Sequence, residues 1–442
     1  MPFYEDGCFY FYHYKHKIGI AAEAQNWTLS TTKDFIRYTD HGELFRHGEK
    51  GEQDYIFRSG TLLKKDDIYH FFYGGDNVVE CLLHASGKDI KDLKKDNFRL
   101  PIEAGYGPTE WRDPFICWCD EINSYILIIG TRKIQGKQYH DGCNVCFTST
   151  DLENWEFKGD FWAPEQYTTH EMPDLFKIGD WWYLIISEYS DYTQIIYRRS
   201  KSIFGPWELA SSDALDGPSY FAGRTVADDD GRRFLCGWIC GKKDRDDRSQ
   251  LGGDNGMWMH QVYQKNDGSL GTAIPESIYK AFNERRSLLS HEEVITSPYG
   301  RKAKVLGSVS GSLFVIVALI EAEEGANAFS INLLEDDKTG EAYEYKFFPS
   351  ENKFMMSRTP NHGIIPPDHF RGMEKLYRSC QLKDKKEFFI QIIYDDTFVI
   401  AYIDGTALSG RFYSKMGENI SVSVFNGQIK VKEFYVREGR KE

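Results

Sequence analysis

One short pattern returns along the first half of this chain. It consists of a polar step, an acidic residue, an apolar residue and, in most copies, an aromatic residue shortly afterwards. The copies lie at residues 31–38, 85–90 and 148–155, with a weaker copy at 199–207. The acidic residues Asp34, Asp89 and Asp151 are 55 and 62 residues apart, by subtraction of their positions. A period of this length indicates one supersecondary unit that is repeated along the chain.

The runs that precede these copies predict antiparallel strands. They are rich in aromatic residues, which favour strands over helices, and Asp-Gly steps between apolar runs are strong hairpin signals. The predicted strands are residues 8–13, 68–74, 124–130 and 181–187, and a fifth unit covers 219–238. Five such units predict an all-β protein in which residues 1–285 form a five-bladed β-propeller.

The sequence changes in character after residue 285. Residues 286–299 contain Ser, His and Pro and are interpreted as a linker. Strand-like runs then follow at 311–321, 329–334, 343–349, 388–394, 399–404, 420–425 and 431–437. Their alternation is typical of two packed antiparallel sheets, so we predict a β-sandwich at 300–442.

Charge and cysteine content limit the partners of the protein. A net charge of −13 argues against nucleic acid and anionic membranes, which need a basic surface. No stretch approaches ~18 consecutive apolar residues, so no membrane-spanning helix is expected. The nine cysteines are scattered, and Cys143 and Cys146 lack a second ligand pair at zinc-site spacing. We therefore expect buried reduced thiols, no metal, and a cytoplasmic protein without a signal peptide.

Two carboxylates stand just before a proline and a predicted strand. They are Glu171, ahead of Pro173, and Asp113, ahead of Pro114. Because proline cannot donate to a central ladder, we expect both carboxylates at strand entrances. In a propeller such positions converge on a central pocket. Most glycosidases need two carboxylates, one on each side of the sugar bond that they cleave. The sequence therefore predicts a paired acid site.

Further residues support this interpretation. The guanidinium of Arg112 is suited to hold a hydroxyl or a carboxylate. Trp27, Phe57 and Trp111 are aromatic residues that we expect to form sugar-binding surfaces. A partly apolar setting of Glu171 would raise the pKa of its carboxyl, as a proton donor requires.

These motifs resemble glycoside hydrolase family 32, the β-fructofuranosidases, invertases, inulinases and levanases. Trp-Arg-Asp-Pro at 111–114 resembles the family's Arg-Asp-Pro motif, and Glu-Met-Pro-Asp-Leu-Phe at 171–176 is similar to its Glu-Cys-Pro-Asp-Leu-Phe. The segment 57–61 looks like the family's Phe-Ser-Gly-Ser, with Ser59 in the serine position. Asn26-Trp27 and 224–238 resemble its Trp-Gly-His step and its fifth blade. The family's fold is a five-bladed propeller followed by a β-sandwich.

The resemblance implies a hydrolase that removes terminal β-fructofuranosyl residues from small fructosides such as sucrose, with retention of configuration and without a cofactor. Glu171 would be the general acid/base, and Asp113 with Arg112 would stabilise the transition state through the fructosyl hydroxyls. Ser59, Trp27, Phe57 and Trp111 would bind substrate. The family's nucleophile is an Asp in an Asn-Asp-Pro-Asn-Gly-type motif, and its position is expected just ahead of Met1.

Three other functions are compatible with parts of this pattern. The first is a sugar-binding propeller that lacks the nucleophile and does not turn over. The second is a family 43 hydrolase of arabinofuranosides or xylosides, against which Arg112 and the sandwich argue. A purely structural scaffold is the third, but it would not need Glu171 and Asp113 at strand entrances. The oligomeric state stays open, with the sandwich as the candidate interface of a homo-oligomer.

Overall fold

The computed structural model describes residues 1–14, 26–77, 80–107, 110–137, 139–190, 193–247, 249, 251–252, 255–323, 325–359 and 375–439. Their contacts divide the chain into two units. The first unit comprises Met1–Ala214, Ala222–Gly237 and Asn266–Ser269. The second comprises Leu215–Phe221, Trp238–Lys265 and Leu270–Glu442.

The first four sheets follow one another along the chain, and each is an antiparallel meander. The first sheet contains β1 (Pro2–Glu5), β2 (Cys8–Tyr14), β3 (Trp27–Thr32) and β4 (Thr39–Phe45). The second contains β5 (Phe57–Lys65), β6 (Ile68–Gly75), β7 (Cys81–Gly87) and β8 (Lys94–Leu100). The third contains β9 (Arg112–Cys119), β10 (Ser124–Arg132), β11 (Gly142–Ser149) and β12 (Glu156–Trp162). The fourth contains β13 (Glu171–Ile178), β14 (Trp181–Glu188) and β15 (Gln194–Ser200).

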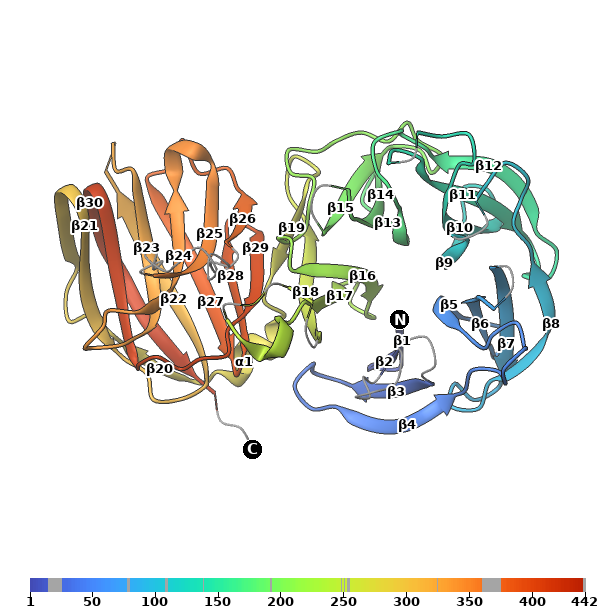
Figure 1. Cartoon of the computed structure of the whole chain (residues 1–442), viewed down its shortest axis with the longest axis horizontal. Coiled ribbons are helices and arrows are strands. Elements are labelled where there is room, and N and C mark those ends of the chain that lie inside the picture. Colours follow the sequence, from blue (N-terminus) through green and yellow to red (C-terminus); the bar gives the residue numbers. More distant parts are fainter. Residues whose placement is uncertain are drawn as a thin grey trace. The chain divides into compact units, whose positions relative to one another are not determined.

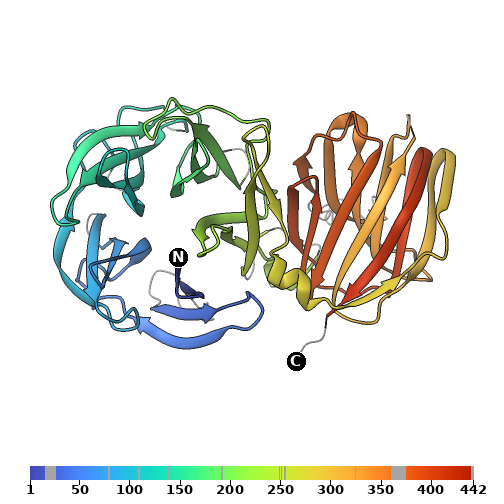
Figure 2. The same cartoon turned by 180° about the vertical axis from the view of Figure 1, so that it is seen from behind.

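A fifth sheet completes the series. It contains β16 (Tyr220–Ala227), β17 (Arg233–Ile239), β18 (Gly256–Gln264) and β19 (Leu270–Ala273). The innermost strands β1, β5, β9, β13 and β16 lie around a common centre, and the same ring is seen from behind (Figures 1 and 2). The predicted five-bladed β-propeller is therefore confirmed, and the four predicted strands coincide with β2, β6, β10 and β14 within two residues.

The acidic residue of the repeat has a structural role. Asp34 Oδ1 accepts hydrogen bonds from the N–H groups of Ile36 and Arg37, each at 2.9 Å. Asp151 Oδ1 accepts equivalent bonds from the two residues Glu153 and Asn154, at 2.9 and 2.8 Å. A short acidic side chain that bonds to the backbone ahead of it stabilises a tight turn. In the first and third blades, the repeat therefore marks the turn that follows the third strand.

The second unit contains a sandwich-like sheet whose two layers share one strand. Its strands are β20 (Glu284–Ser287), β21 (Glu293–Ser308), β22 (Leu313–Ala322), β23 (Ala328–Glu335), β24 (Ala342–Phe348), β25 (Lys353–Thr359), β26 (Leu376–Ser379), β27 (Glu387–Asp395), β28 (Phe398–Ile403), β29 (Thr406–Arg411) and β30 (Asn419–Glu438). The first part of β30 pairs with β23 and the second part with β22. The bend lies near Asn426, whose φ of 48° is left-handed. The predicted C-terminal sandwich is thus confirmed as two layers that meet along β30.

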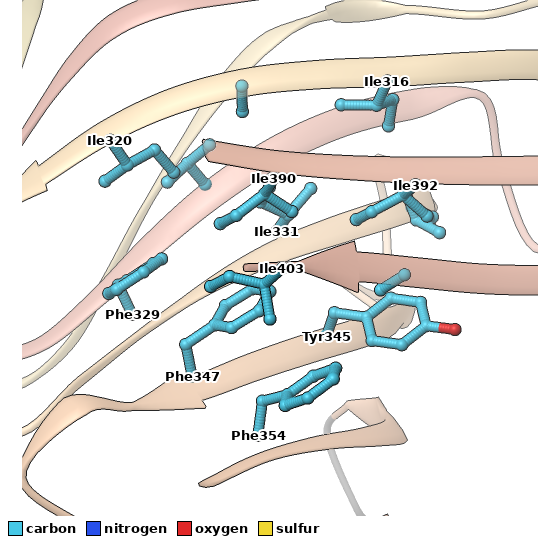
Figure 3. Close-up of a cluster of buried hydrophobic side chains, with 14 of the residues drawn as sticks. Ile316, Ile320, Phe329, Ile331, Tyr345, Phe347, Phe354, Ile390, Ile392 and Ile403 are labelled. Atoms are coloured by element: carbon cyan, nitrogen blue, oxygen red, sulfur yellow. The ribbon is translucent and has the colours of Figure 1, made fainter. Parts of the chain in front are cut away.

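The core of this sheet consists of the side chains that alternate inward along its strands. Figure 3 shows Phe329 and Ile331 of β23 facing Ile390 and Ile392 of β27, with Phe347 beside them. All five are fully buried. Phe329 and Phe347 stack with ring centroids 5.1 Å apart. Removing a buried ring of this kind costs about 3–5 kcal/mol, which makes this cluster a principal source of the unit's stability.

The segment expected as a linker carries regular structure. Residues 286–299 overlap β20 and β21, and both strands pair with β30. Most residues of β21 are exposed, so the segment lacks the apolar alternation by which a strand is recognised in sequence. The domain limits expected at 285 and 300 stay a prediction. The described helical elements are short: α1 (Glu276–Ala281), η2 (Lys243–Arg245) and η3 (Pro349–Glu351). None of the described helices is long and apolar enough to cross a membrane.

Candidate active site

The same irregularity begins the inner strands of the second, third and fourth blades. Each inner strand advances three residues while its neighbour advances two, between Phe57 and Gly60, Arg112 and Phe115, and Glu171 and Asp174. Such a bulge bends the strand and re-aims its side chains. The second residue of the bulge is left-handed in two blades, with φ of 59° at Asp113 and 52° at Met172. Glu171 therefore occupies in its blade the position that Arg112 occupies in the preceding one.

The carboxylate of Asp113 is held by the two blades on either side. Ser59 Oγ donates a hydrogen bond to Asp113 Oδ1. The backbone N–H of Met172 donates to Asp113 Oδ2 at 3.2 Å. Asp113 is 5% exposed, so both oxygens are fixed by protein donors in a nearly dry setting. A carboxylate fixed in this way is prearranged for a ligand that approaches from the centre of the ring.

Glu171 lies beside it, in direct contact with Arg112. The guanidinium of Arg112 donates through Nη2 to Glu171 Oε1, and Tyr189 also bonds to the Glu171 carboxyl. Burial raises the pKa of Glu171 to about 7, because it outweighs the lowering by Arg112, and the negative charge of Asp113 adds to the rise. A carboxyl with this pKa is a proton donor near neutral pH.

Arg112 lies among several carboxylates. Its Nη2 is also 3.0 Å from Glu110 Oε2. Burial alone would lower the pKa of Arg112, but the neighbouring charges of Asp113, Glu171, Glu110 and Glu80 together raise it. Arg112 Nε is buried without a hydrogen-bond partner in the part of the chain that the structure describes. Arg112 therefore carries a permanent positive charge and a free donor at the centre of the acid pair.

A second arginine, Arg224 in the fifth blade, bonds to the backbone of the second and third blades next to Asp113. Arg224 of β16 is 3% exposed. Its Nη1 donates to Gly60 O at 2.9 Å and Pro114 O at 2.8 Å, and its Nη2 donates to Asp113 O at 2.7 Å. Burial lowers the pKa of Arg224 to about 10, which leaves it charged. Arg224 of the fifth blade thus fixes the backbone of Asp113 in the third blade.

A cavity of about 220 Å³ continues along the inner strands next to Arg224. It is lined by Met1, Pro2, Phe3, Tyr4, Gly60, Thr61, Leu62, Phe115, Ile116, Arg224, Thr225, Val226 and Ala227. Gly60, Thr61 and Leu62 follow Ser59 along β5, and Phe115 and Ile116 follow Asp113 along β9. The cavity therefore lies deeper in the propeller than the acid pair.

Not every residue predicted for the site reaches it. Glu171, Asp113, Arg112 and Ser59 come together as described above. Trp27 and Phe57 are each 2% exposed and pack against each other, and Trp111 is 0% exposed. Their rings have no free face for a sugar. The expectation that these three aromatic residues line the pocket is corrected accordingly, since the demand for apolar core volume takes them into the blade cores.

Two acidic residues near the site carry no sequence motif. Glu80 is 2% exposed and accepts a hydrogen bond from the N–H of Trp111 at 2.5 Å. Burial raises the pKa of Glu80 to about 7. Glu110 is the second partner of Arg112. Both residues precede strands at irregular positions, so only the folded chain shows that they surround Arg112.

No group of three or more potential metal ligands occurs among the described residues. Cys143 and Cys146 are both buried in β11 as free thiols. Burial raises the pKa of each thiol to about 12, which keeps both protonated and unreactive.

The sequence profile described as the glycosyl hydrolases family 32 N-terminal domain matches residues 1–263 of this chain, which is more than half of its length. The chain belongs to glycoside hydrolase family 32. It is therefore a glycosidase of the β-fructofuranosidase type, in agreement with the prediction from the motifs. This membership also decides against the family 43 alternative.

Individual members of the family match along most of their length. The sucrose-6-phosphate hydrolase of Vibrio alginolyticus is 24% identical over 421 residues, which are 88% of this chain and 77% of that protein. The sucrose-6-phosphate hydrolase of Staphylococcus xylosus is 22% identical, over 97% of this chain and 87% of that protein.

Solved structures agree with the fold. The sucrose-6-phosphate hydrolase from Lactobacillus gasseri superposes with a TM-score of 0.77 at 15% identity, covering 98% of this chain and 88% of that chain. Fructan 1-exohydrolase IIa from Cichorium intybus gives a TM-score of 0.79 at 14% identity, covering 100% of this chain and 94% of that one. At these identities the superposition describes the fold alone.

Proposed function

We propose that this glycosidase hydrolyses the bond between a terminal β-fructofuranosyl unit and the remainder of a small fructoside, with sucrose as the simplest substrate. Relatives named sucrose-6-phosphate hydrolase and fructan exohydrolase support a fructoside as substrate. The observation that carries the proposal is the placement of Glu171, with a raised pKa, next to Arg112 and Asp113. This arrangement supplies a proton donor, a cation and a fixed carboxylate in one place.

In this proposal Glu171 protonates the glycosidic oxygen as the bond breaks. Asp113 is already held by Ser59 and Met172, so it can bind fructosyl hydroxyls without reorganising. Arg112 stabilises the ionised form of Glu171 that results from proton transfer. The same carboxylate then takes a proton from the water that completes the reaction, as in a retaining mechanism.

The residue that attacks the sugar carbon is proposed to act from the entrance of the first blade. β1 begins at Pro2, and the corresponding entrances of the third and fourth blades carry Arg112 and Glu171. The hairpins of the first and fourth blades close at the pairs Glu5↔Cys8 and Ile178↔Trp181, so the position that Glu171 holds in the fourth blade falls three residues ahead of Met1 in the first. The sequence-based expectation that the family's nucleophilic Asp belongs there stays a prediction.

The test is fructose release from sucrose and from short β-linked fructo-oligosaccharides. Two forms are compared: the 442-residue chain and the same chain preceded by an Asn-Asp-Pro-Asn segment, which places the Asp three residues ahead of Met1. We expect the second form to release fructose, and Glu171→Gln to lower kcat by at least about 10²-fold in it while substrate binding persists. If the extended chain cleaves no β-fructofuranoside, the proposal fails.

The second candidate function is saturable sugar binding without turnover. Asp113 and Arg112 are built to bind hydroxyls whether or not a nucleophile is present, and this favours it. Fructose release by the unextended chain, abolished in Glu171→Gln, would exclude it. Cytoplasmic localisation and a homo-oligomer are retained as predictions; fractionation and light scattering address them.

A further inference from the structure

Glu110 is a carboxylate beside the acid pair that the proposed mechanism does not use. It lies in the connection between β8 and β9, two residues before Arg112. Its side chain is 23% exposed, and that of Glu171 is 19% exposed. Glu110 is therefore shielded from water to almost the same degree as the proton donor.

Glu110 and Glu171 share one nitrogen of Arg112. Arg112 Nη2 lies 3.0 Å from Glu110 Oε2, and the same nitrogen donates to Glu171 Oε1. Two oxygens that both contact one nitrogen are at most about 6 Å apart, which is twice the length of a hydrogen bond. Glu110 therefore acts on Glu171 in two ways. One is its own negative charge, and the other is the share of the Arg112 charge that it neutralises.

The charged and titratable groups that face Glu171 come from three parts of the chain. β9 contributes Arg112 and Asp113, the connection after β14 contributes Tyr189, and the connection before β9 contributes Glu110. Burial is the largest influence on the pKa of Glu171 and raises it. The Arg112 charge lowers this pKa, the Asp113 charge raises it, the hydrogen bond from Tyr189 lowers it, and the Glu110 charge raises it. Glu110 thus opposes the cation that it contacts.

Removing the charge of Glu110 changes both influences in the same direction. Glu171 loses a negative neighbour, and the Arg112 guanidinium is left to pair more fully with Glu171. Each change favours the ionised form of the Glu171 carboxyl, and each therefore lowers its pKa. With Glu110 present, Glu171 stays protonated at a higher pH than the contact with Arg112 alone would allow.

From this geometry we propose that Glu110 is a positioning residue of the reaction, which shares the Arg112 guanidinium with Glu171. In this role Glu110 keeps Glu171 protonated until the proton passes to the glycosidic oxygen. It also leaves the resulting carboxylate basic enough to take a proton from water in the second step. The proposal rests on the proposed function and deepens it, because it assigns a residue to the tuning of the proton donor.

The test follows the Glu171 carboxyl directly, so that it does not depend on turnover. Carbon-13 NMR of the 442-residue chain with labelled glutamate carboxyls gives their titration curves, and the Glu171 signal is the one that Glu171→Gln lacks. In Glu110→Gln, which keeps the size of the side chain, we expect the midpoint of Glu171 to fall by about 0.5–1 pH unit. In an active form of the chain, the decrease in kcat/KM should move to lower pH by the same amount, while KM for sucrose stays nearly unchanged.

The matched control is Asp120→Asn, which also removes one negative charge from the third blade. Asp120 follows the far end of β9, about 25 Å along the strand from Arg112, and Asn keeps the acceptor for Trp118 Nε1. The midpoint of Glu171 should not change in this variant. An unchanged midpoint in Glu110→Gln, as a purely structural role would give, overturns the proposal, and so does an equal fall in Asp120→Asn. If the midpoint falls only in Glu110→Gln but no form of the chain cleaves a fructoside, the shared arginine is confirmed and the proposed function fails.

Discussion

The backbone N–H of Met172 donates a hydrogen bond to the carboxylate of Asp113, 3.2 Å away, and both residues hold the same left-handed position in adjacent blades. The bulge that points the Asp113 side chain to the centre thus recurs 59 residues later and supplies the donor that fixes it. The geometry of the acid pair is set by the backbone of two neighbouring blades.

The first prediction concerns this backbone. Met172 has a φ of 52°, which glycine adopts without cost and β-branched residues resist. Met172→Gly should therefore leave fructoside binding within about 2-fold of wild type, whereas Met172→Val should lower stability by about 1–2 kcal/mol and weaken binding. Chemical denaturation and calorimetry measure both. Equal behaviour of the two variants would show that the left-handed conformation is not required.

The second prediction is the pH dependence of catalysis. Glu171 must be protonated to donate, and burial raises the pKa of its carboxyl to about 7. In an active form of the chain, kcat/KM should therefore fall as the pH rises through about 7. Asp113→Asn removes a negative charge that contributes to the raised pKa of Glu171. This substitution should therefore shift the decrease in kcat/KM to lower pH. If kcat/KM of Asp113→Asn decreases at the same pH as in the wild type, the assignment of Glu171 as the titrating group is contradicted.

The third prediction is the pH dependence of stability that Glu80 causes. Burial raises the pKa of its carboxyl from the ordinary value of 4.5 to about 7 in the folded protein. Between these values the folded state binds more protons than the unfolded state, so this group lowers the free energy of unfolding as the pH rises from about 4.5 to 7. Glu80→Gln keeps an acceptor for the Trp111 N–H and removes the titration.

We expect Glu80→Gln to be more stable than wild type at about pH 8, by about 1–3 kcal/mol, and to show no such advantage at about pH 4. Urea unfolding at the two pH values measures the difference. An advantage of the same size at both values would mean that packing, and not ionisation, is responsible.

The fourth prediction concerns Arg224. Arg224→Met would leave the carbonyl oxygens of Gly60, Asp113 and Pro114 buried without this donor. We expect a loss of about 2–5 kcal/mol in stability, and weaker fructoside binding in the fraction that folds. Arg99→Met is the matched control, since Arg99 also donates to carbonyl oxygens but lies exposed on β8. If both variants lose a comparable amount of stability, the three buried bonds of Arg224 contribute no more than the bonds of an exposed arginine.

The fold and part of the site were accessible from the sequence. Glu171 and Asp113 were found because prolines beside them mark strand entrances, which is a local signal. Trp27, Phe57 and Trp111 are predicted for the pocket because aromatic rings form sugar-binding surfaces and because these residues lie in segments that resemble family motifs, but all three are buried. An aromatic residue has the same sequence signature in a core and on a sugar-binding surface, so its burial cannot be inferred locally.

What the sequence by itself determined is the all-β repeat, the sandwich that follows it, and the two acidic motifs, because strand periodicity, turn residues and prolines act over a few residues. The tertiary structure alone decided that Arg112 contacts Glu171, that Ser59 and Met172 hold Asp113, and that Arg224 bonds to three carbonyl groups of two other blades. These contacts join residues between 54 and 164 positions apart. Residues so far apart in the sequence come into contact only when the blades assemble around one axis. The same assembly buries Glu171, and this burial raises the pKa of its carboxyl.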